Sequence, residues 1–305
     1  MAEVYAAYHK LPDEIEKSSS GAIFVALSNY ILGKNGKIIG GGYSYVTNKV
    51  EHVVCQTPQE RDCCRGSKYI QSHVEKAVYE KLEKELRKGT PILYIGTPCQ
   101  VAAVLQYVSV KNIKAESLVT CDILCHGVGS PGIWKKFLEY KKTKIDYLTF
   151  KDKRRGWEKP LCVAKSENKE ISLRAYSWLY FSDSIMRPVC YKCQYATVNR
   201  VGDFTIGDFW NVKRKAPEMY NPRGTSFIMV NTDKGKACFN NIKRELVYKQ
   251  ISIDDIMQSN MQQPTKASVY RGKVMEDFTK KNSAAFFKKW ELKLLMDKVI
   301  TRIVR

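Results

Sequence analysis

Residues 91–107, PILYIGTPCQVAAVLQY, indicate the fold class of this chain. The first five of them form a short apolar run of the kind that becomes a buried strand. The turn Gly96-Thr97-Pro98 follows, and residues 99–107 are predicted to form a helix, because Pro is favoured at the start of a helix. A strand that leads directly into a helix is the building unit of α/β proteins, so we expect an α/β fold.

Apolar and amphipathic runs alternate on both sides of this segment, as they do in a sheet flanked by helices. Strands are predicted at 38–45, 50–55, 118–124, 203–207 and 226–232, and helices at 22–32, 74–88, 131–142 and 234–246. The middle third is less regular, with short strands at 147–151 and 161–165 and a helix at 177–186. The sequence therefore predicts a mixed sheet flanked by helices, an irregular cysteine-bearing middle region and a C-terminal helix.

The length of 305 residues and the 44% hydrophobic content allow a sizeable core. We expect one domain over residues 1–250, with a weaker alternative boundary near residue 150. The polar segment 259–272 is predicted to be a loop that leads to a final helix at 284–303. Residues 251–305 would then form a linker and a basic C-terminal helix.

The net charge of +20 favours an anionic partner, which can be nucleic acid, an acidic membrane surface or an acidic protein. The basic residues are spread along the whole chain, with neither a C₂H₂ zinc finger nor an aromatic RNA-binding signature. We therefore do not expect nucleic-acid binding. The sequence has no apolar run of about 20 residues, so no membrane span is expected either.

The N-terminal sequence Met1-Ala2-Glu3-Val4 lacks a secretory signal pattern, so we expect a cytoplasmic protein. Cysteines in a reducing compartment are rarely used for disulfides. The ten cysteines of this chain therefore suggest metal binding or redox chemistry.

Four cysteines occupy positions where such chemistry is plausible. Cys99 follows the strand-to-helix turn, Cys125 ends a predicted strand, and Cys190 and Cys193 form a Cys-x-x-Cys. Strand ends in an α/β sheet face one crevice, so these thiols are expected to converge. Four thiolates suit a cubane iron–sulfur cluster or zinc, and ordinary buried cysteines are the third alternative. The other six are assigned structural roles: Cys55, Cys63, Cys64, Cys121, Cys162 and Cys238.

Two loops of small residues are candidates for an anion site. Ser18-Ser19-Ser20-Gly21 precedes a predicted helix, whose positive end and backbone N–H groups suit a phosphate. Gly66-Ser67-Lys68-Tyr69 supplies a hydroxyl, a cation and an aromatic ring. An ordinary helix cap and a surface turn are the alternatives. His126, beside Cys125, is a weak candidate for proton transfer.

These motifs together resemble the beta subunit of the deazaflavin (coenzyme F-420) hydrogenase/dehydrogenase family, in its bacterial branch. The resemblance covers roughly residues 2–235 and follows the family's order of motifs. Those motifs are Ser18-Ser19-Ser20-Gly21 and its helix, GSKYIQS (66–72), GTPCQ (96–100), CHG (125–127), FKDK with Gly156-Trp157 (150–157), Cys190-x-x-Cys193 and TIGDFW (205–210).

The resemblance implies a flavin and iron–sulfur oxidoreductase with FAD and one 4Fe-4S cluster. It implies that Cys99, Cys125, Cys190 and Cys193 hold the cluster. It also implies that the flavin lies against the two loops of small residues. The alternative is a zinc-stabilised accessory protein that binds an acidic partner and performs no redox chemistry.

The sequence departs from the family at two places. Ala22 stands where a second Gly is usual, and we expect the protein to lack the ferredoxin-like domain with which many bacterial members begin. An acidic electron carrier such as a ferredoxin is therefore the expected partner. Some bacterial relatives accompany surface-polysaccharide synthesis, which makes proteins of that process further candidate partners.

The C-terminal helix is a candidate docking surface for the carrier, because basic residues dominate its polar side. A solvated charged face and attachment to an anionic membrane surface are the alternatives. The basic residues are Lys288, Lys289, Lys293, Lys298, Arg302 and Arg305. The apolar face expected to pack on the domain comprises Leu292, Leu295, Met296, Val299 and Ile303.

Overall fold

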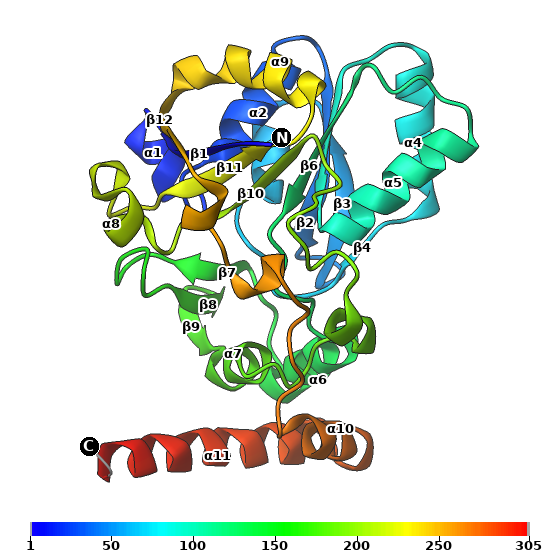
Figure 1. Cartoon of the computed structure of the whole chain (residues 1–305). Helices are drawn as coiled ribbons and strands as arrows, with labels where there is room; N and C mark the ends of the chain where they lie inside the picture. Colours follow the sequence, from blue (N-terminus) through cyan, green and yellow to red (C-terminus); the bar gives the residue numbers. More distant parts are fainter. Residues whose placement is uncertain (1, 304–305) are drawn as a thin grey trace.

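A computed structural model describes the backbone of residues 2–303 and the side chains of residues 2–296. Its largest element is a nine-stranded mixed sheet (Figure 1). The strands lie in the order β12 (Leu246–Ile251), β1 (Glu3–His9), β11 (Ser226–Val230), β10 (Phe204–Asp208), β6 (Leu118–Ile123), β5 (Ile92–Gly96), β2 (Lys37–Ser44), β3 (Lys49–Cys55) and β4 (Ser72–His73).

The centre of this sheet is parallel. Strands β10, β6, β5 and β2 run in one direction, whereas β12, β1 and β11 pair antiparallel at one side and β3 pairs antiparallel with β2. The carboxyl ends of the four parallel strands therefore meet at one edge. In open α/β sheets this edge is where ligands bind.

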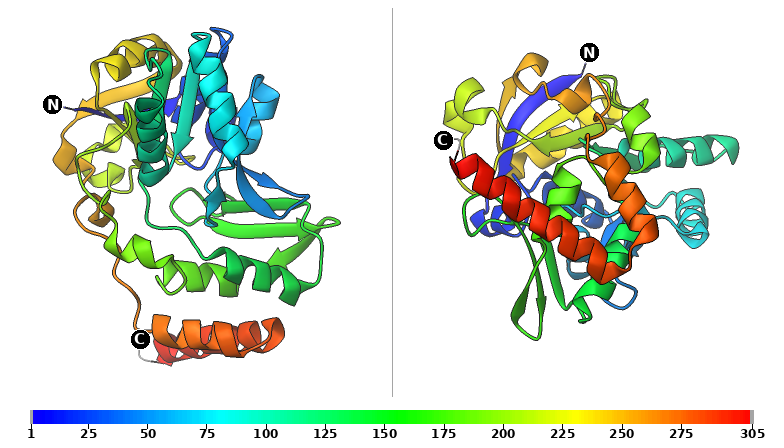
Figure 2. Two further views of the ribbon diagram at one scale, coloured as in Figure 1. Left: turned by 90° about the vertical axis from the view of Figure 1, so that its right-hand side faces the viewer. Right: turned by 90° about the horizontal axis from the view of Figure 1, so that it is seen from below.

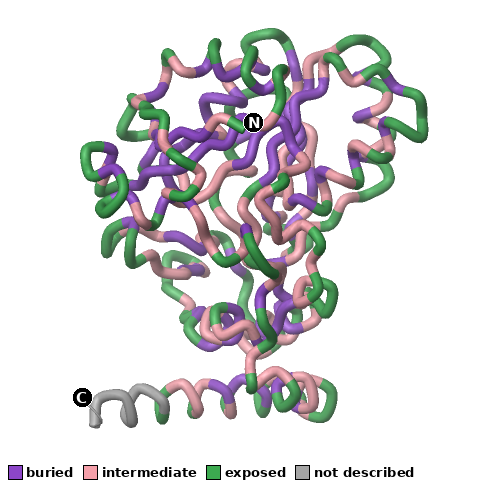
Figure 3. The backbone as a smooth tube through the Cα atoms, in the orientation of Figure 1, coloured by how far each residue is buried: buried purple, intermediate pink, exposed green. Residues whose placement is uncertain are grey.

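Helices cover both faces of the sheet (Figures 1 and 2). On one face, α2 (Ile23–Leu32) and α9 (Asp233–Ile242) pack through residues such as Leu27 and Phe239. On the other, α4 (Lys76–Arg87) and α5 (Pro98–Val110) contribute Leu82 and Val104. Figure 3 shows that the buried residues follow the central strands, as two-sided coverage requires.

A second layer lies below the carboxyl edge of the sheet. It contains a three-stranded sheet, β7 (Tyr147–Asp152), β8 (Leu161–Ser166) and β9 (Lys169–Ser172), with α6 (Pro131–Lys141) and α7 (Arg174–Phe181). Helices α10 (Arg271–Lys280) and α11 (Ser283–Ile303) lie beneath (Figures 1 and 2). The remaining elements are α1 (Pro12–Glu16), α3 (Pro58–Arg61), α8 (Val212–Lys215) and six short 3₁₀ turns at 62–64, 188–192, 217–219, 243–245, 253–255 and 259–261.

The predicted fold class is confirmed, including the irregular middle region and the C-terminal helix. Several boundaries differ. The helix predicted at 177–186 is α7, which ends at Phe181 because Asp183 has a left-handed backbone with φ of 57°. The segment predicted as a loop at 259–272 already contains the start of α10.

The predicted packing face of the last helix is wrong for the residues whose side chains the structure describes. Leu292, Leu295 and Met296 are 59%, 54% and 52% exposed, whereas the buried residues in the described part of α11 are Phe286, Phe287 and Trp290. The helix therefore packs through its first two turns, against α6 and α7. The side chains of Lys298, Val299, Arg302, Ile303 and Arg305 lie outside the described residues. Among the described helices, none has the length and hydropathy needed to cross a membrane.

Candidate cofactor site and cysteine centre

A pocket of about 490 Å³ lies at the carboxyl edge of the parallel strands. Gly96, Ile123 and Asp208, the last residues of β5, β6 and β10, line it. A second pocket of about 330 Å³ shares four of its lining residues, namely Ser18, Ser19, Gly66 and Lys151. The two pockets therefore adjoin, and the volume of each falls in the range of small-molecule and cofactor sites.

The two loops of small residues meet at this site. The Ser67 amide donates to Ser19 Oγ at 2.7 Å, and the two Oγ atoms lie 3.0 Å apart. All the predicted binding residues line the larger pocket except Gly21: Ser18, Ser19, Ser20, Gly66, Ser67, Lys68 and Tyr69. Two segments almost fifty residues apart thus form one wall.

Gly21 has a different role from its neighbours. A Cβ at this position would lie 2.5 Å from the Ala7 carbonyl oxygen and 2.9 Å from the Ser226 amide nitrogen. A bare backbone lets the serine loop pack directly against β1 and β11. The next residue, Ala22, is the N-cap of α2 and has φ of 63°, a conformation that glycine adopts more easily.

Three lysines place positive charge along the site. Lys68 Nζ donates to the carbonyls of Cys63 (3.0 Å) and Arg65 (2.8 Å), and burial lowers the pKa of Lys68 to about 8. Burial also lowers the pKa of Lys153 to about 8. Lys151 is paired with Asp208 beneath the Trp210 ring. With pKa values near 8, Lys68 and Lys153 remain mostly protonated at neutral pH, so this wall suits an anion.

His52, on β3, is a pocket residue that no motif of the sequence singles out. Its side chain is buried and stacks on Tyr94, with 5.4 Å between ring centroids. Neither ring nitrogen has a hydrogen-bond partner of good geometry among the described residues. Burial lowers the pKa of His52 to about 4, so the ring is neutral and available to a ligand.

This histidine predicts a pH dependence of stability. The pKa of His52 is about 4 in the folded protein against 6.5 for an ordinary histidine, so the unfolded chain takes up the proton first. The free energy of unfolding is therefore highest above pH 6.5 and falls by about 2 kcal/mol on going from pH 7 to pH 5. Urea unfolding should show that His52→Gln removes this part of the acid sensitivity, whereas His73→Gln, at an exposed site, keeps it. Equal acid sensitivity in the wild type and His52→Gln would contradict the assignment.

His126 lies at the rim of the pocket, and its ring nitrogens already have polar neighbours within the protein. Its Nε2 is 2.6 Å from Asp183 Oδ1, and its Nδ1 is 3.4 Å from Asn260 Nδ2. The Asp183 carboxylate orients the ring. Proton transfer by His126 remains a prediction.

The four cysteines predicted to converge lie in one neighbourhood. Cys99 is in the first turn of α5, Cys125 follows β6, Cys190 is in the 188–192 turn and Cys193 comes directly after it. Burial raises the pKa of Cys125 to about 12, and the nearby thiols of Cys190, Cys99 and Cys193 contribute to the shift. Within the described chain these four do not supply three sulfur atoms within 4.8 Å of one another. Their spacing is thus wider than a single shared ion requires.

A buried ion pair fixes the segment that follows the Cys-x-x-Cys. Arg200 Nε donates to Asp122 Oδ1 at 3.1 Å, and the exposed fractions of the two side chains are 1% and 0%. Arg200 Nη1 also donates to the carbonyls of Tyr195 and Thr197, at 3.1 Å each. Because Asp122 lies on β6, three residues before Cys125, this pair holds two cysteine-bearing segments in register.

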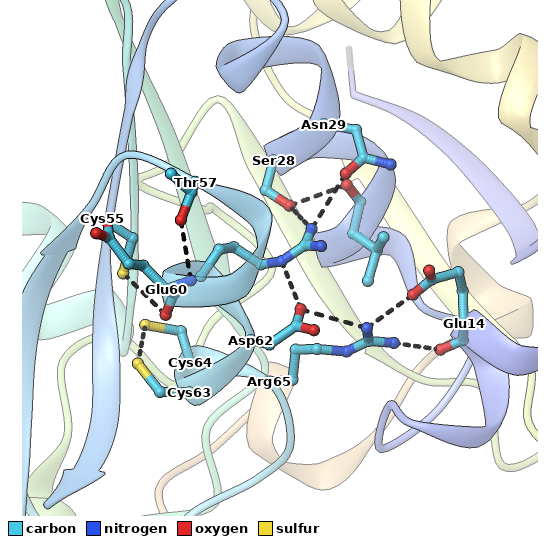
Figure 4. A network of polar contacts seen from close by, with 12 residues as sticks. Glu14, Ser28, Asn29, Cys55, Thr57, Glu60, Asp62, Cys63, Cys64 and Arg65 are labelled. Carbon is cyan, nitrogen blue, oxygen red and sulfur yellow. Dashed lines mark hydrogen bonds and ion pairs between the residues drawn. The ribbon is translucent and has the colours of Figure 1, made fainter.

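Three of the cysteines that are predicted to be structural lie together elsewhere. The sulfur atoms of Cys55, Cys63 and Cys64 are all within 4.8 Å of one another (Figure 4). Cys64 also lines the larger pocket. Their proximity could not be inferred from the sequence, because it depends on how the 56–62 segment folds back onto β3.

Comparison with known proteins identifies a matching protein family and a solved structure with a similar fold. A sequence profile for the C-terminal part of the coenzyme F420 hydrogenase/dehydrogenase beta subunit matches residues 89–256. A chain of the F420-reducing [NiFe] hydrogenase complex from Methanosarcina barkeri has a similar structure, with a TM-score of 0.54 and 15% sequence identity. The match covers 94% of this chain and 89% of that one. No curated protein matches the chain significantly.

Proposed function

Because the chain belongs to the coenzyme F420 hydrogenase/dehydrogenase beta-subunit family, we propose that it is a redox enzyme that uses FAD and one 4Fe-4S cluster. In this proposal it passes electrons between a one-electron carrier and a substrate bound in the pocket. One observation carries the proposal: Cys125 lines the larger pocket and also belongs to the four-cysteine group. A cofactor in the pocket would therefore lie directly beside the metal centre.

The residues that line the two adjoining pockets fit FAD in their chemistry. The hydroxyls of Ser19 and Ser67, with Lys68 and Lys153, suit a pyrophosphate, and the neutral His52 offers a hydrogen-bonding group deeper in the pocket. Flavin would supply hydride exchange with one partner and single-electron exchange with the cluster. The protein's own residues would hold the ring, neutralise the phosphates and exclude water.

The four-cysteine group fits an iron–sulfur cluster better than zinc. Thiolates that share one zinc ion lie about 3.8 Å apart, because each Zn–S bond is about 2.3 Å in a tetrahedron. Cubane ligands bind four separate irons and are spaced more widely. The open arrangement of Cys99, Cys125, Cys190 and Cys193 supports the second geometry.

Purification without air tests the proposal most directly. We expect a yellow-brown protein with about four irons and four sulfides per chain. FAD should be released into the supernatant on heating. A colourless protein that contains zinc but neither iron nor flavin would contradict the proposal and support the zinc-stabilised accessory protein.

Lys68→Ala is expected to weaken FAD binding by about tenfold, because it removes a partly buried cation from the loop proposed to bind the phosphates. Flavin fluorescence during titration of the flavin-free protein would give the dissociation constant. Lys159→Ala is the control, since this lysine lies outside both pockets. Unchanged affinity in Lys68→Ala would place the phosphates elsewhere.

We further propose that the one-electron carrier is an acidic protein such as a ferredoxin, steered by the +20 net charge. Lys288 on α11 is exposed, whereas Lys289 is paired with the buried Asp277 at 2.5 Å and is a poor choice for charge reversal. Reduction by an acidic ferredoxin should slow several-fold between low and physiological ionic strength. Lys288→Glu should slow it at low salt. A rate that responds to salt but not to Lys288→Glu would move the docking surface away from α11.

A further inference from the structure

The three-cysteine cluster, Cys55, Cys63 and Cys64, is separate from the four cysteines proposed as cluster ligands. Cys55 is the last residue of β3, and Cys63 and Cys64 belong to the turn at 62–64. The Cys63 and Cys64 sulfurs are 3.8 Å apart, and both lie within 4.8 Å of the Cys55 sulfur (Figure 4). Cys55 is buried, Cys64 is half-buried and Cys63 is exposed. The cluster is thus closed on one side and open to solvent on the other.

The neighbouring strand leaves room for these sulfurs. A Cβ at Gly42 would lie 3.0 Å from Cys63 Sγ, and a Cβ at Gly40 would lie 3.4 Å from Cys64 Sγ. Both glycines are on β2, the partner of β3. The two thiols therefore lie directly over bare backbone, in a space that larger residues would restrict.

The turn that carries Cys63 and Cys64 is anchored independently of the thiols. Arg61 is buried and donates to Ser28 and to Asn29 Oδ1 on α2, and its Nε pairs with Asp62 at 2.8 Å. Arg65 pairs with Glu14 at 2.7 Å. Figure 4 labels Asp62 and Arg65 of this turn together with their partner Glu14 and the sulfur atoms. The three thiols are therefore held close together before any ligand arrives, which reduces the entropic cost of binding one.

We propose that Cys55, Cys63 and Cys64 bind one thiophilic divalent cation, with zinc as the physiological ion. Three thiolates about 3.8 Å apart are the ligand set of a tetrahedral Zn²⁺ ion with Zn–S bonds of about 2.3 Å. The cluster approaches this spacing, unlike the four-cysteine group. The exposed side, at Cys63, leaves the fourth position to water or a solute thiol. Each thiol loses its proton to solvent on binding.

The ion would join β3 to the loop at 66–69, which is proposed to bind the FAD phosphates. Cys64 lines the larger pocket, and Lys68 Nζ donates to the Cys63 carbonyl. Holding residues 63 and 64 against β3 therefore fixes Gly66, Ser67 and Lys68 as well. This consequence rests on the proposed FAD site, whereas metal binding itself does not.

Elemental analysis of the full-length protein, purified without air, tests the site. We expect about one zinc per chain in the wild type, in addition to iron, and its loss in Cys63→Ser and Cys64→Ser with iron unchanged. Cys238→Ser, at a buried position on α9, is the control and should keep both metals. Cys190→Ser should lose iron and keep zinc. Failure of the proposed zinc site can therefore be distinguished from failure of the proposed function.

Cys63 is exposed, so Cys63→Ser is expected to fold, which circular dichroism would verify. Cobalt titration of the zinc-depleted wild type should give a thiolate-to-cobalt charge-transfer band that Cys63→Ser lacks. Chelation of zinc should also speed tryptic cleavage after Arg65. Zinc content that is indifferent to Cys63→Ser would overturn the proposal. So would a wild type that neither contains zinc nor binds cobalt, or one whose three thiols include a disulfide in the air-free protein.

Discussion

Cys190→Ser, purified without air, is expected to retain less than about a tenth of the wild-type iron. The proposed cubane is held by four thiolates, and a serine hydroxyl is a much poorer iron ligand at neutral pH. Cys190 is also half-buried among the thiols of Cys193 and Cys99, so solvent offers no ready substitute ligand. Iron and sulfide analysis would measure the loss, and the broad visible absorption of the cluster should disappear with it.

Two other cysteines serve as controls for this substitution. Cys162 hydrogen-bonds the Phe150 carbonyl at 3.5 Å in the lower layer, and Cys238 is buried on α9. Cys162→Ser and Cys238→Ser should keep their iron. Full iron occupancy in Cys190→Ser would show that the proposed ligand set is wrong, whichever cofactor the pocket binds.

The second large effect that we expect is a loss of folding stability in Asp122→Ala. Asp122→Ala leaves the Arg200 guanidinium buried without its carboxylate, and such a change costs about 3–5 kcal/mol. The Gly202 amide also loses its bond to Asp122 Oδ2, which is 2.9 Å long. Urea unfolding of the cofactor-free protein would give the change as a shift in midpoint at constant slope.

Glu218→Gln is the matched control for Asp122→Ala. Glu218 pairs with Lys249, and both side chains are about half exposed, so solvent screens the pair and the loss of stability should be small. Asp122→Ala should also lower iron content, because Arg200 no longer holds the segment after Cys193 to β6. Equal losses of stability in the two variants would show that the buried pair stabilises the fold no more than the exposed pair does.

Sequence reasoning succeeded where local pattern decides structure. The central strands β5 and β6 are short apolar runs beside clear turns, and α5 has Pro98 at its start. The sequence pattern does not predict the outer strands β1 and β12, for local reasons. β1 contains Ala6 and Ala7, which have low strand propensity, and β12 continues from the helical region without a Gly or Pro to separate them.

The same distinction applies to the candidate site. The loops at 18–21 and 66–69 carry composition signals, so the sequence identified them, although it could not show that Ser19 bonds Ser67. No sequence pattern identifies Asp122 and Arg200, because their importance depends on an ion pair between residues that are 78 positions apart. The sequence does not distinguish His52 from other strand residues, because the lack of hydrogen-bond partners for its ring arises only where the fold buries it.

The order of strands in the large sheet also bears on how the protein behaves at high concentration. The sheet ends at β4, which has only two residues, and at β12, where Lys249 and Gln250 are exposed. Long, flat, apolar edges are templates on which further chains add strands, and short or charged edges prevent this. The short β4 and the polar β12 are poor templates of this kind, so the addition of further strands is disfavoured at both of these strands.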